Sequence, residues 1–245
     1  MTKRPFIHKP KRQKKGISFW DAEYAEGGHL KLSDDASEDF EKFTRFLVRQ
    51  TKKELLNPTG SVLDMGCGNG RNLVYLAETF GMHGHGYDIS GSAIKQAVAA
   101  SSQYNLEYTA RSMAGDVDLS DESQTLVLDM MSSHFLSKAE RAHMREEVHR
   151  VLKPGGWFFV KTFLRDGDMH SARLLKEFPA HEEGTYTHPV MGMVEHVYYE
   201  DELIEFLEEK FVIHKIYRSH KHISKGKARK RRTISIYAQK SPFEK

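Results

Sequence analysis

The sequence predicts an α/β fold in which a doubly wound, mostly parallel sheet ends in an antiparallel hairpin. From residue 61 onward, short apolar runs alternate with segments of helical periodicity. Parallel strands need helical crossovers that cover both faces of the sheet, and they leave this alternation in a sequence. A glycine-rich loop follows the first apolar run, as in sheets that bind a ligand at the ends of their strands. The last two apolar runs have no helix between them, so we expect them to form the hairpin.

The individual elements follow from the same periodicities in chain order. A first helix, capped by Asp34 or Ser37, has an apolar face at helical spacing. This face consists of Phe40, Phe43, Phe46 and Leu47. Strands are predicted over residues 61–65, 85–88, 106–110, 125–129, 157–163, 211–217 and 233–239, and further helices over 71–79, 93–101, 138–152 and 201–209. The stretch between residues 163 and 201, which contains Pro179 and Pro189, is predicted to be irregular.

The chain divides into three regions. Residues 1–16 lack apolar periodicity and are expected to form a disordered basic arm. Residues 17–58 are expected to form an N-terminal helical cap, and residues 59–245 the α/β domain, with a basic hairpin loop at 218–232. A chain of 245 residues is long enough to bury one sizeable core.

Composition excludes several classes of protein. No apolar run reaches the roughly 18 residues that a membrane span needs. The basic N-terminus has no apolar stretch behind it, unlike a secretory signal. Cys67 is the only cysteine, which rules out an internal disulfide and a multi-cysteine metal site. We therefore expect a cytoplasmic protein that neither enters a membrane nor binds a metal.

Charge is separated along the chain, although the net charge is only +3. Residues 1–15 carry seven Lys and Arg and residues 218–232 carry eight, with no acid in either segment. The other 22 bases stand against 34 acids, so the rest of the protein carries −12. Two basic segments on an acidic body predict attraction to an anionic partner.

The glycine-rich loop predicts a ligand site at the point where the strand order reverses. An acid and three glycines form it: Asp64, Gly66, Gly68 and Gly70. A dinucleotide site would have its third glycine at the position of Arg71, so the loop departs from that pattern. A carboxylate at Asp64 suits the cationic amino end of S-adenosyl-L-methionine better than a pyrophosphate.

Two further motifs strengthen this interpretation. Asp88 ends the second predicted strand, where an acid can accept hydrogen bonds from both hydroxyls of a ribose. The run Val151-Leu152-Lys153-Pro154-Gly155-Gly156-Trp157 precedes the fifth strand. With these motifs and the glycine loop, residues 60–163 resemble the class I S-adenosylmethionine-dependent methyltransferase family. The resemblance implies a Rossmann-like methyltransferase fold, with the three loop glycines along the methionine part of the cofactor and Asp88 on its ribose.

The family places the adenine just after the third strand, and here that segment leaves alternatives open. Many members have an acid directly after the strand, where this chain has Ser112. Met113 could lie against the adenine ring and Asp116 could reach its amino group. In the alternative interpretation, Asp116 and Asp118 only form a polar loop, as such residues commonly do.

Candidate catalytic residues lie at the end of the fourth strand and directly after it. A sulfonium methyl group is already activated, so the enzyme mainly aligns the acceptor and excludes water, and a base is needed only where a proton must leave. Asp129 and His134 are the candidates for positioning the acceptor or removing its proton. His134 could instead cap a helix or fill space in the core. Residues 188–199 could form a mobile lid, or a surface excursion whose methionines fill gaps.

An aromatic segment near the N-terminus gives a further resemblance. Trp20-Asp21-x-x-Tyr24-x-x-Gly27 is similar to the N-terminal segment of small-molecule members of the family, in which an aromatic helix closes over the cofactor. The alternative is a hydrophobic anchor for the basic arm.

Three hypotheses remain for the activity. A small-molecule acceptor is slightly favoured by the aromatic segment and by strand four, which ends in Asp129-Met130-Met131-Ser132 rather than in the motif of many base-amino methyltransferases. An RNA acceptor is favoured by the two basic segments. A catalytically silent RNA- or ribosome-binding protein is disfavoured, because the loop keeps both Asp64 and Asp88.

Overall fold

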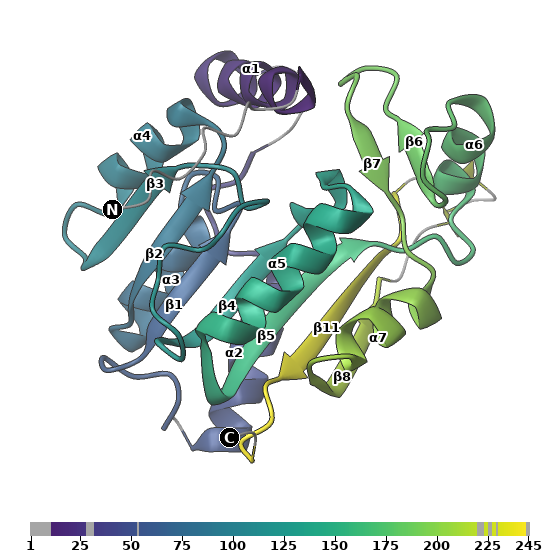
Figure 1. Ribbon diagram of the computed structural model, residues 1–245. Helices are drawn as coiled ribbons and strands as arrows, with labels where there is room; N and C mark the ends of the chain where they lie inside the picture. The colour runs from purple at the N-terminus through teal and green to yellow at the C-terminus, as the bar shows by residue number, and fades with distance from the viewer. Residues whose placement is uncertain are drawn as a thin grey trace, which may run out of the picture.

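The computed structural model describes residues 11–27, 32–52, 54–219, 223–224, 227–228 and 230–243. Its centre is a seven-stranded sheet in the order β3-β2-β1-β4-β5-β11-β8 (Figure 1). The strands are β1 (Ser61–Met65), β2 (His83–Asp88), β3 (Leu106–Ala110), β4 (Gln124–Met130), β5 (Leu152–Phe163), β8 (Val212–Arg218) and β11 (Thr233–Gln239). The first five are parallel, and β11 runs antiparallel to both β5 and β8. The predicted doubly wound α/β fold with a terminal hairpin is confirmed.

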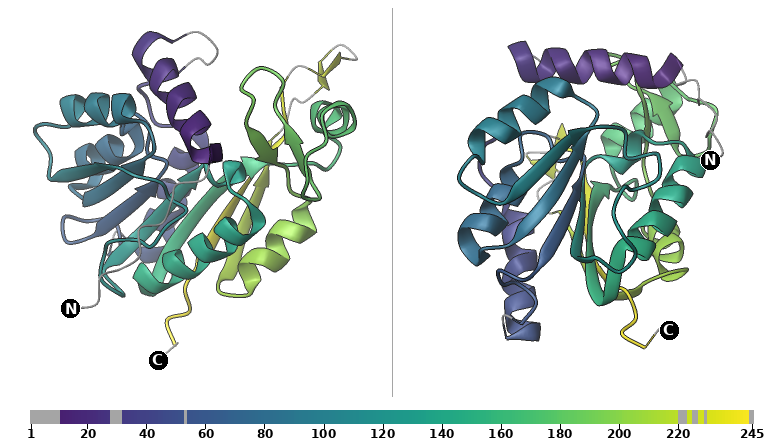
Figure 2. Two further views of the ribbon diagram at one scale, coloured as in Figure 1. Left: turned by 45° about the horizontal axis from the view of Figure 1, so that its top comes forward. Right: turned by 60° about the vertical axis from the view of Figure 1, so that its left-hand side comes forward.

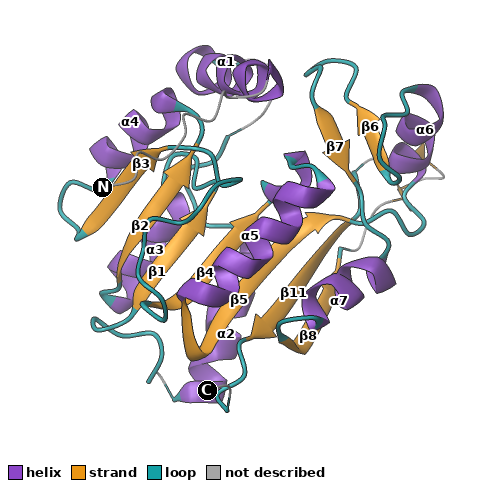
Figure 3. Ribbon diagram, in the orientation of Figure 1, coloured by secondary structure: helices purple, strands orange, loops and turns teal. Residues whose placement is uncertain are grey.

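Helices cover both faces of the sheet (Figures 2 and 3). The helices are α1 (Lys11–Glu26), α2 (Glu38–Thr51), α3 (Arg71–Phe80), α4 (Gly91–Ala100), α5 (Lys138–Val151), α6 (Met169–Glu177) and α7 (Glu200–Glu208), and a short 3-10 helix, η1, spans Ser133–Phe135. One apolar cluster joins the sheet to α5 and α7, and another joins it to α2 and α3. The strands between them are therefore buried on both sides, as continuous apolar runs require.

Strand β4 shows how the two clusters divide its side chains. Val127 belongs to the cluster on the α5 side, while Leu126 and Leu128 belong to the cluster on the α2 side. Successive side chains of a strand point to opposite faces, and both faces of β4 are covered, so all three side chains are fully buried. A polar residue such as Asp129, at the end of this strand, is consequently carried into the interior.

Helix α2 packs against the sheet and is not part of a separate cap. Ser37 begins it by accepting a hydrogen bond from the amide of Phe40, as predicted. Its apolar face lies on the sheet, with the Phe43 ring 4.8 Å from that of Phe159 and 4.7 Å from that of Tyr237. Only α1, from the segment 17–58 that we expected to form a cap, lies over the ends of β1 and β2 (Figure 1).

The N-terminal arm differs from the expectation in part. Helix α1 begins at Lys11, so residues 11–16 are helical rather than disordered. Residues 1–10 lie outside the described residues. The apolar periodicity of α1 starts only near Phe19, which is why its first turns carry no signal in the sequence.

The stretch predicted to be irregular contains three short elements. Helix α6 is followed by a hairpin of β6 (Thr185–Thr187) and β7 (Val194–His196). This hairpin and α6 share a small core of Leu174, Tyr186 and Val197. Strands of three residues are too short to show a periodicity. Within the basic loop, β9 (Ile223–Ser224) pairs with β10 (Lys227–Ala228), a second hairpin that the sequence did not predict.

Candidate functional site

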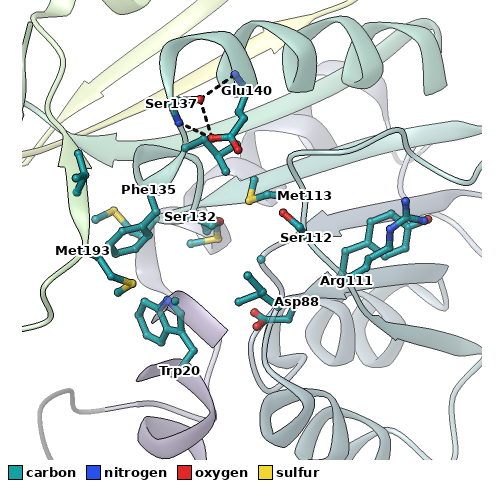
Figure 4. Close-up of a pocket in the computed structure, with 18 of the residues that line it drawn as sticks. Trp20, Asp88, Arg111, Ser112, Met113, Ser132, Phe135, Ser137, Glu140 and Met193 are labelled. Carbon is teal, nitrogen blue, oxygen red and sulfur yellow. Dashed lines mark hydrogen bonds between the residues drawn. The ribbon is translucent and has the colours of Figure 1, made fainter. Parts of the chain in front are cut away.

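A cavity of about 490 Å³ opens at the ends of β1, β2 and β4, beneath α1 (Figure 4). Its volume is in the range of about 300–1,000 Å³ that is usual for small-molecule sites. One half of it is formed by the glycine loop, the end of β2 and the loop after β3. The other half is formed by the end of β4, η1, the start of α5 and β7. We call these the β1–β3 half and the β4–β7 half.

The glycine loop has no room for side chains at two of its positions. Gly66 and Gly68 both have positive φ, at +79° and +56°, which glycine adopts without strain. A Cβ on Gly66 would overlap Ser132, and a Cβ on Gly68 would overlap the Tyr24 hydroxyl. Gly66 lines the cavity, so the loop presents bare backbone to whatever binds there.

Gly70 and Asp64 lie away from the cavity surface. A Cβ on Gly70 would lie 2.7 Å from the Tyr108 hydroxyl, so this glycine allows close contact with β3. Asp64 is fully buried beneath the loop, where its Oδ2 accepts a hydrogen bond from Asn72 at 3.2 Å. Burial raises the pKa of Asp64 to about 7, and its Oδ1 has no partner among the described residues.

Asp88 faces the cavity, as predicted from its place at the end of β2. Its Oδ2 accepts a hydrogen bond from the Gly68 amide at 2.8 Å, and its Oδ1 accepts one from Ser90 at 2.9 Å. Burial raises the pKa of Asp88, while these amides favour its charged form. The carboxylate thus joins the glycine loop to β2 and keeps lone pairs for a ligand's hydroxyls.

The loop after β3 brings two of its three predicted residues to the cavity. Ser112 and Met113 line it, and the Met113 sulfur faces Gly66. Asp116 is exposed and lies 3.1 Å from His143 on α5, outside the cavity. Arg111, which the sequence did not single out, also lines the cavity and lies 4.7 Å over the ring of Tyr87.

Asp129 does not line the cavity. It is fully buried behind the turn that follows β4. Its Oδ1 accepts a hydrogen bond from the Ser133 amide at 3.0 Å and lies 3.0 Å from the Ser132 hydroxyl. Burial raises the pKa of Asp129, and its Oδ2 has no partner among the described residues. These contacts hold the turn that places Ser132 against the glycine loop.

His134 also lies behind the cavity wall. Its ring centroid is 4.1 Å from that of Phe135 and 5.1 Å from that of Phe163. Burial lowers the pKa of His134 to about 4, so the ring is neutral near pH 7. Its Nδ1 has no partner among the described residues, and Phe135, its neighbour, is the residue that reaches the cavity.

Helix α1 forms the roof and contacts both halves. On the β1–β3 side, Asp21 accepts hydrogen bonds from the Ser90 hydroxyl at 2.8 Å and the Ser92 amide at 3.0 Å, at the start of α4. The pKa of Asp21 is lowered by these hydrogen bonds. On the other side, the Trp20 ring lies 5.6 Å from that of Phe135, edge to face. Trp20 and Tyr24, predicted from their spacing, both line the cavity.

The β4–β7 half is mainly apolar. Its walls come from Met130, Met131, Phe135, Leu136, Met193 and Val194. Glu140 is the one charged side chain among the described residues that line this half. Its Oε2 accepts hydrogen bonds from the Ser137 amide and hydroxyl, both at 2.7 Å. Its other oxygen points toward the space between Met113 and Ser132 (Figure 4). The sequence pointed to the end of strand four and to residues 188–199 but did not single out Phe135, Leu136 or Glu140, because their common wall forms only in the fold.

The described residues contain neither a cluster of metal-ligating side chains nor a helix of membrane-spanning length and apolarity. No group of three or more His, Cys, Asp or Glu side chains there could hold a metal ion. None of the helices there is long and apolar enough to cross a membrane.

Similarity to known proteins agrees with this geometry. Residues 62–156 match the family described as methyltransferase domain. The chain is 32% identical, over 147 residues, to ribosomal RNA large subunit methyltransferase E of Desulfosudis oleivorans, covering 54% of this chain and 69% of that one. It is 27% identical to fatty-acid O-methyltransferase of Mycolicibacterium smegmatis over 143 residues, covering 58% of this chain and about half, 51%, of that one.

The fold agrees as well. A crystal structure of an S-adenosylmethionine-dependent methyltransferase from Methanosarcina mazei superposes on this chain with a TM-score of 0.67 and 24% sequence identity. The match covers 84% of this chain and 99% of the other. Since the matched residues contain the glycine loop and Asp88, the chain belongs to the class I S-adenosylmethionine-dependent methyltransferase family and is an enzyme of that kind.

Proposed function

We propose that this methyltransferase acts on a small, largely apolar acceptor that carries a hydrogen-bond donor. The observation that carries the proposal is the β4–β7 half of the cavity, which is lined by methionine, leucine, valine and phenylalanine side chains and contains one carboxylate, Glu140. Apolar walls favour an apolar body, and a carboxylate accepts a hydrogen bond from an amine or hydroxyl.

The β1–β3 half fits the cofactor. Gly66 leaves space for a ligand to approach the backbone, and Asp88 has lone pairs for a ribose. Ser112 and Met113 would lie along the adenine, with Arg111 and Tyr87 behind them. When bound, S-adenosyl-L-methionine supplies a methyl group on a positively charged sulfur. Asp64 would act through the loop above it rather than by direct contact.

The size of the cavity supports a small acceptor. Its 490 Å³ would accommodate both the cofactor and the acceptor, and α1 covers it. Trp20 of the roof and Phe135 of the β4–β7 half would exclude water from the acceptor, which favours transfer to the acceptor over side reactions.

Proton removal would not depend on His134 or Asp129, since both lie behind the wall. Glu140 is the group that could hold or accept a proton of the acceptor, because one of its oxygens points toward the cavity. The alternative is an acceptor atom whose lone pair is already available, which needs no base. We assign Asp129 a positioning role, through the turn that carries Ser132.

RNA is a second candidate acceptor, which the similarity to a ribosomal RNA methyltransferase favours. The basic segment 218–232 supports it less strongly than its charge suggests. Arg218 pairs with Glu200, Arg231 with Glu195 at 2.7 Å, and Arg232 donates to the Asp166 carbonyl at 2.6 Å. These three cations are engaged by the fold, and the side chains of residues 220–229 lie outside the described residues.

The decisive experiment uses the full-length chain and methyl-labelled S-adenosyl-L-methionine. Separate incubations with a metabolite extract, total RNA and total protein should place the label in the metabolite fraction. Glu140→Gln should lower that transfer about tenfold, the loss of one charge-assisted hydrogen bond, while the affinity for S-adenosylhomocysteine stays within about twofold. Label in RNA alone would contradict the proposal and favour the second candidate.

A further inference from the structure

The loop between β3 and β4 is held in place from α5. Residues 111–123 form no helix or strand, and so long a loop in a compact domain needs contacts that fix its path. Its first residues, Ser112 and Met113, line the cavity. Its later residues Val117 and Leu119 pack into the apolar cluster beneath α5.

Arg150 on α5 uses every one of its five donors, three of them on this loop. An arginine side chain has five N–H groups in a rigid fork. Two bond the loop's backbone, at the carbonyls of Val117 (2.8 Å) and Leu119 (2.9 Å), and one bonds the Asp121 carboxylate at 2.6 Å. The other two bond both oxygens of Glu147, each at 2.8 Å.

Glu147 completes the clamp from the same helix. Its side chain is buried, and its Oε2 also accepts a hydrogen bond from the Val117 amide at 2.6 Å. Val117 is thereby held at both its amide and its carbonyl. In the other direction, the Glu122 amide donates to the Arg150 carbonyl at 2.9 Å. The hydrogen bond from Arg150 lowers the pKa of Glu147, so the pair stays charged.

The clamp lies outside the cavity but sets one of its walls. The Met113 sulfur is 3.9 Å from where a Cβ on Gly66 would lie, so the loop faces the glycine loop across the β1–β3 half. Within the loop, Arg111 donates a hydrogen bond to the carbonyl of Asp116, the neighbour of Val117, so the clamped segment is tied to the residues that line the cavity. A shift of residues 114–121 would therefore move Ser112 and Met113.

We propose that Arg150 and Glu147 are positioning residues for the adenosyl part of the cofactor, acting through the Val117–Asp121 segment. Neither touches the cavity. The inference concerns the cofactor side alone and holds whatever the acceptor is.

The test compares two arginines of α5. Arg150→Lys keeps the charge but loses the planar fork, which an ammonium group cannot replace. Arg145→Lys is the matched control, because Arg145 is more buried, at 8% against 31%, and binds Glu209 and the Phe206 carbonyl on the side of α7. Affinity for S-adenosylhomocysteine is measured by calorimetry, thermal stability by calorimetric scanning, and loop mobility by amide hydrogen exchange of residues 113–121.

We expect Arg150→Lys to raise the dissociation constant for S-adenosylhomocysteine about tenfold, or about 1.4 kcal/mol, and to speed exchange in the loop. Arg145→Lys should lower the melting temperature at least as much, yet change that constant by no more than about twofold. Equal affinities in the two variants, or unchanged exchange in Arg150→Lys, would overturn the proposal. If Arg150→Lys does not fold, Glu147→Gln serves as the second variant. It should raise the dissociation constant for S-adenosylhomocysteine about threefold and speed amide exchange in the loop. An unchanged dissociation constant together with unchanged exchange would likewise overturn the proposal.

Discussion

The two halves of the cavity differ in how their walls are built. The β1–β3 half is made largely of the turns that follow adjacent strands, where backbone amides meet a carboxylate: Asp88 accepts hydrogen bonds from the amides of Gly68 and Ser90. The β4–β7 half joins α1, η1, α5 and a hairpin from residues far apart in the chain. The β1–β3 half therefore rests on backbone contacts between adjacent strands and on hydrogen bonds from α5 to the loop after β3, whereas the β4–β7 half depends on side chains that meet from several elements remote in sequence. Four predictions test this contrast.

The largest effect is expected at Gly66, where local backbone geometry and a close contact coincide. Gly66→Ala puts a Cβ on a residue with φ +79° and into the Ser132 side chain. Left-handed backbone costs about 1–2 kcal/mol and overpacking about 1–3, so unfolding free energy should fall by roughly 2–5 kcal/mol and S-adenosylhomocysteine binding should be lost. Urea unfolding and calorimetry measure both. Gly115→Ala is the control, since nothing lies near its Cβ position, and binding by Gly66→Ala at wild-type affinity would break the comparison.

A large effect of pH is expected from His134 in the β4–β7 half. Burial lowers the pKa of His134 from its ordinary value near 6.5 to about 4, so the folded state binds this proton less readily than the unfolded state. The resulting stability is present above pH 6.5 and is lost as the pH falls through 4, a change of about 3 kcal/mol. His134→Gln should remove that share of the acid sensitivity in urea unfolding between pH 7 and pH 4. His143→Gln, at a half-buried histidine of α5, is the control for removing a histidine outside the core.

A smaller effect is expected for Asp88, whose carboxylate faces the ligand and also holds the glycine loop. Asp88→Ala should weaken S-adenosylhomocysteine binding by about 1.5–3 kcal/mol, the cost of lost charge-assisted hydrogen bonds to the ribose. Asp116→Ala is the matched control, because Asp116 lies outside the cavity. Calorimetry showing the larger loss for Asp116 would mean that this acid, as the sequence first suggested, reaches the adenine.

The smallest effect on the fold is expected in the basic loop. Neutralising Lys225, Lys227 and Arg229, which the sequence places in this loop, should leave cofactor affinity and melting temperature unchanged, because the length and charge of a loop contribute little to the stability of the core. Arg231→Gln removes only one charge, fewer than the triple variant. It breaks the ion pair with buried Glu195, however, so it should lower the melting temperature.

A salt titration of RNA binding decides what the loop does. If RNA is the acceptor, the triple variant should flatten the dependence of log affinity on log salt by roughly 2 or more, since each lost phosphate contact removes about 0.7–0.9. Identical slopes, or no RNA binding by the wild type at low salt, leave the small molecule as the acceptor.

Much of the fold and of the cofactor side could be predicted from the sequence, because both depend on local patterns. Apolar runs, helix caps such as Ser37 and the glycine loop each fix backbone geometry within a few residues, and β1, β3 and β11 have the predicted bounds. The α6 segment and the β6–β7 hairpin were missed, because their stability comes from a shared core of Leu174, Tyr186 and Val197 rather than from periodicity.

The tertiary structure alone decided which side chains reach the cavity. Asp129 lies in β4 and His134 in the turn after it, as expected, yet both side chains are buried in the interior, and Phe135, Ser132 and Glu140 line the cavity instead. The sequence by itself determined the sheet, the glycine loop and the place of Asp88, since a strand end and the turn after it are set by neighbouring residues. Three features depend on contacts between segments remote in sequence: the burial of side chains, the position of α1 over the cavity, and the hydrogen bonds from Arg150 to the loop after β3. Such contacts form only in the folded chain, so no local sequence pattern indicates them.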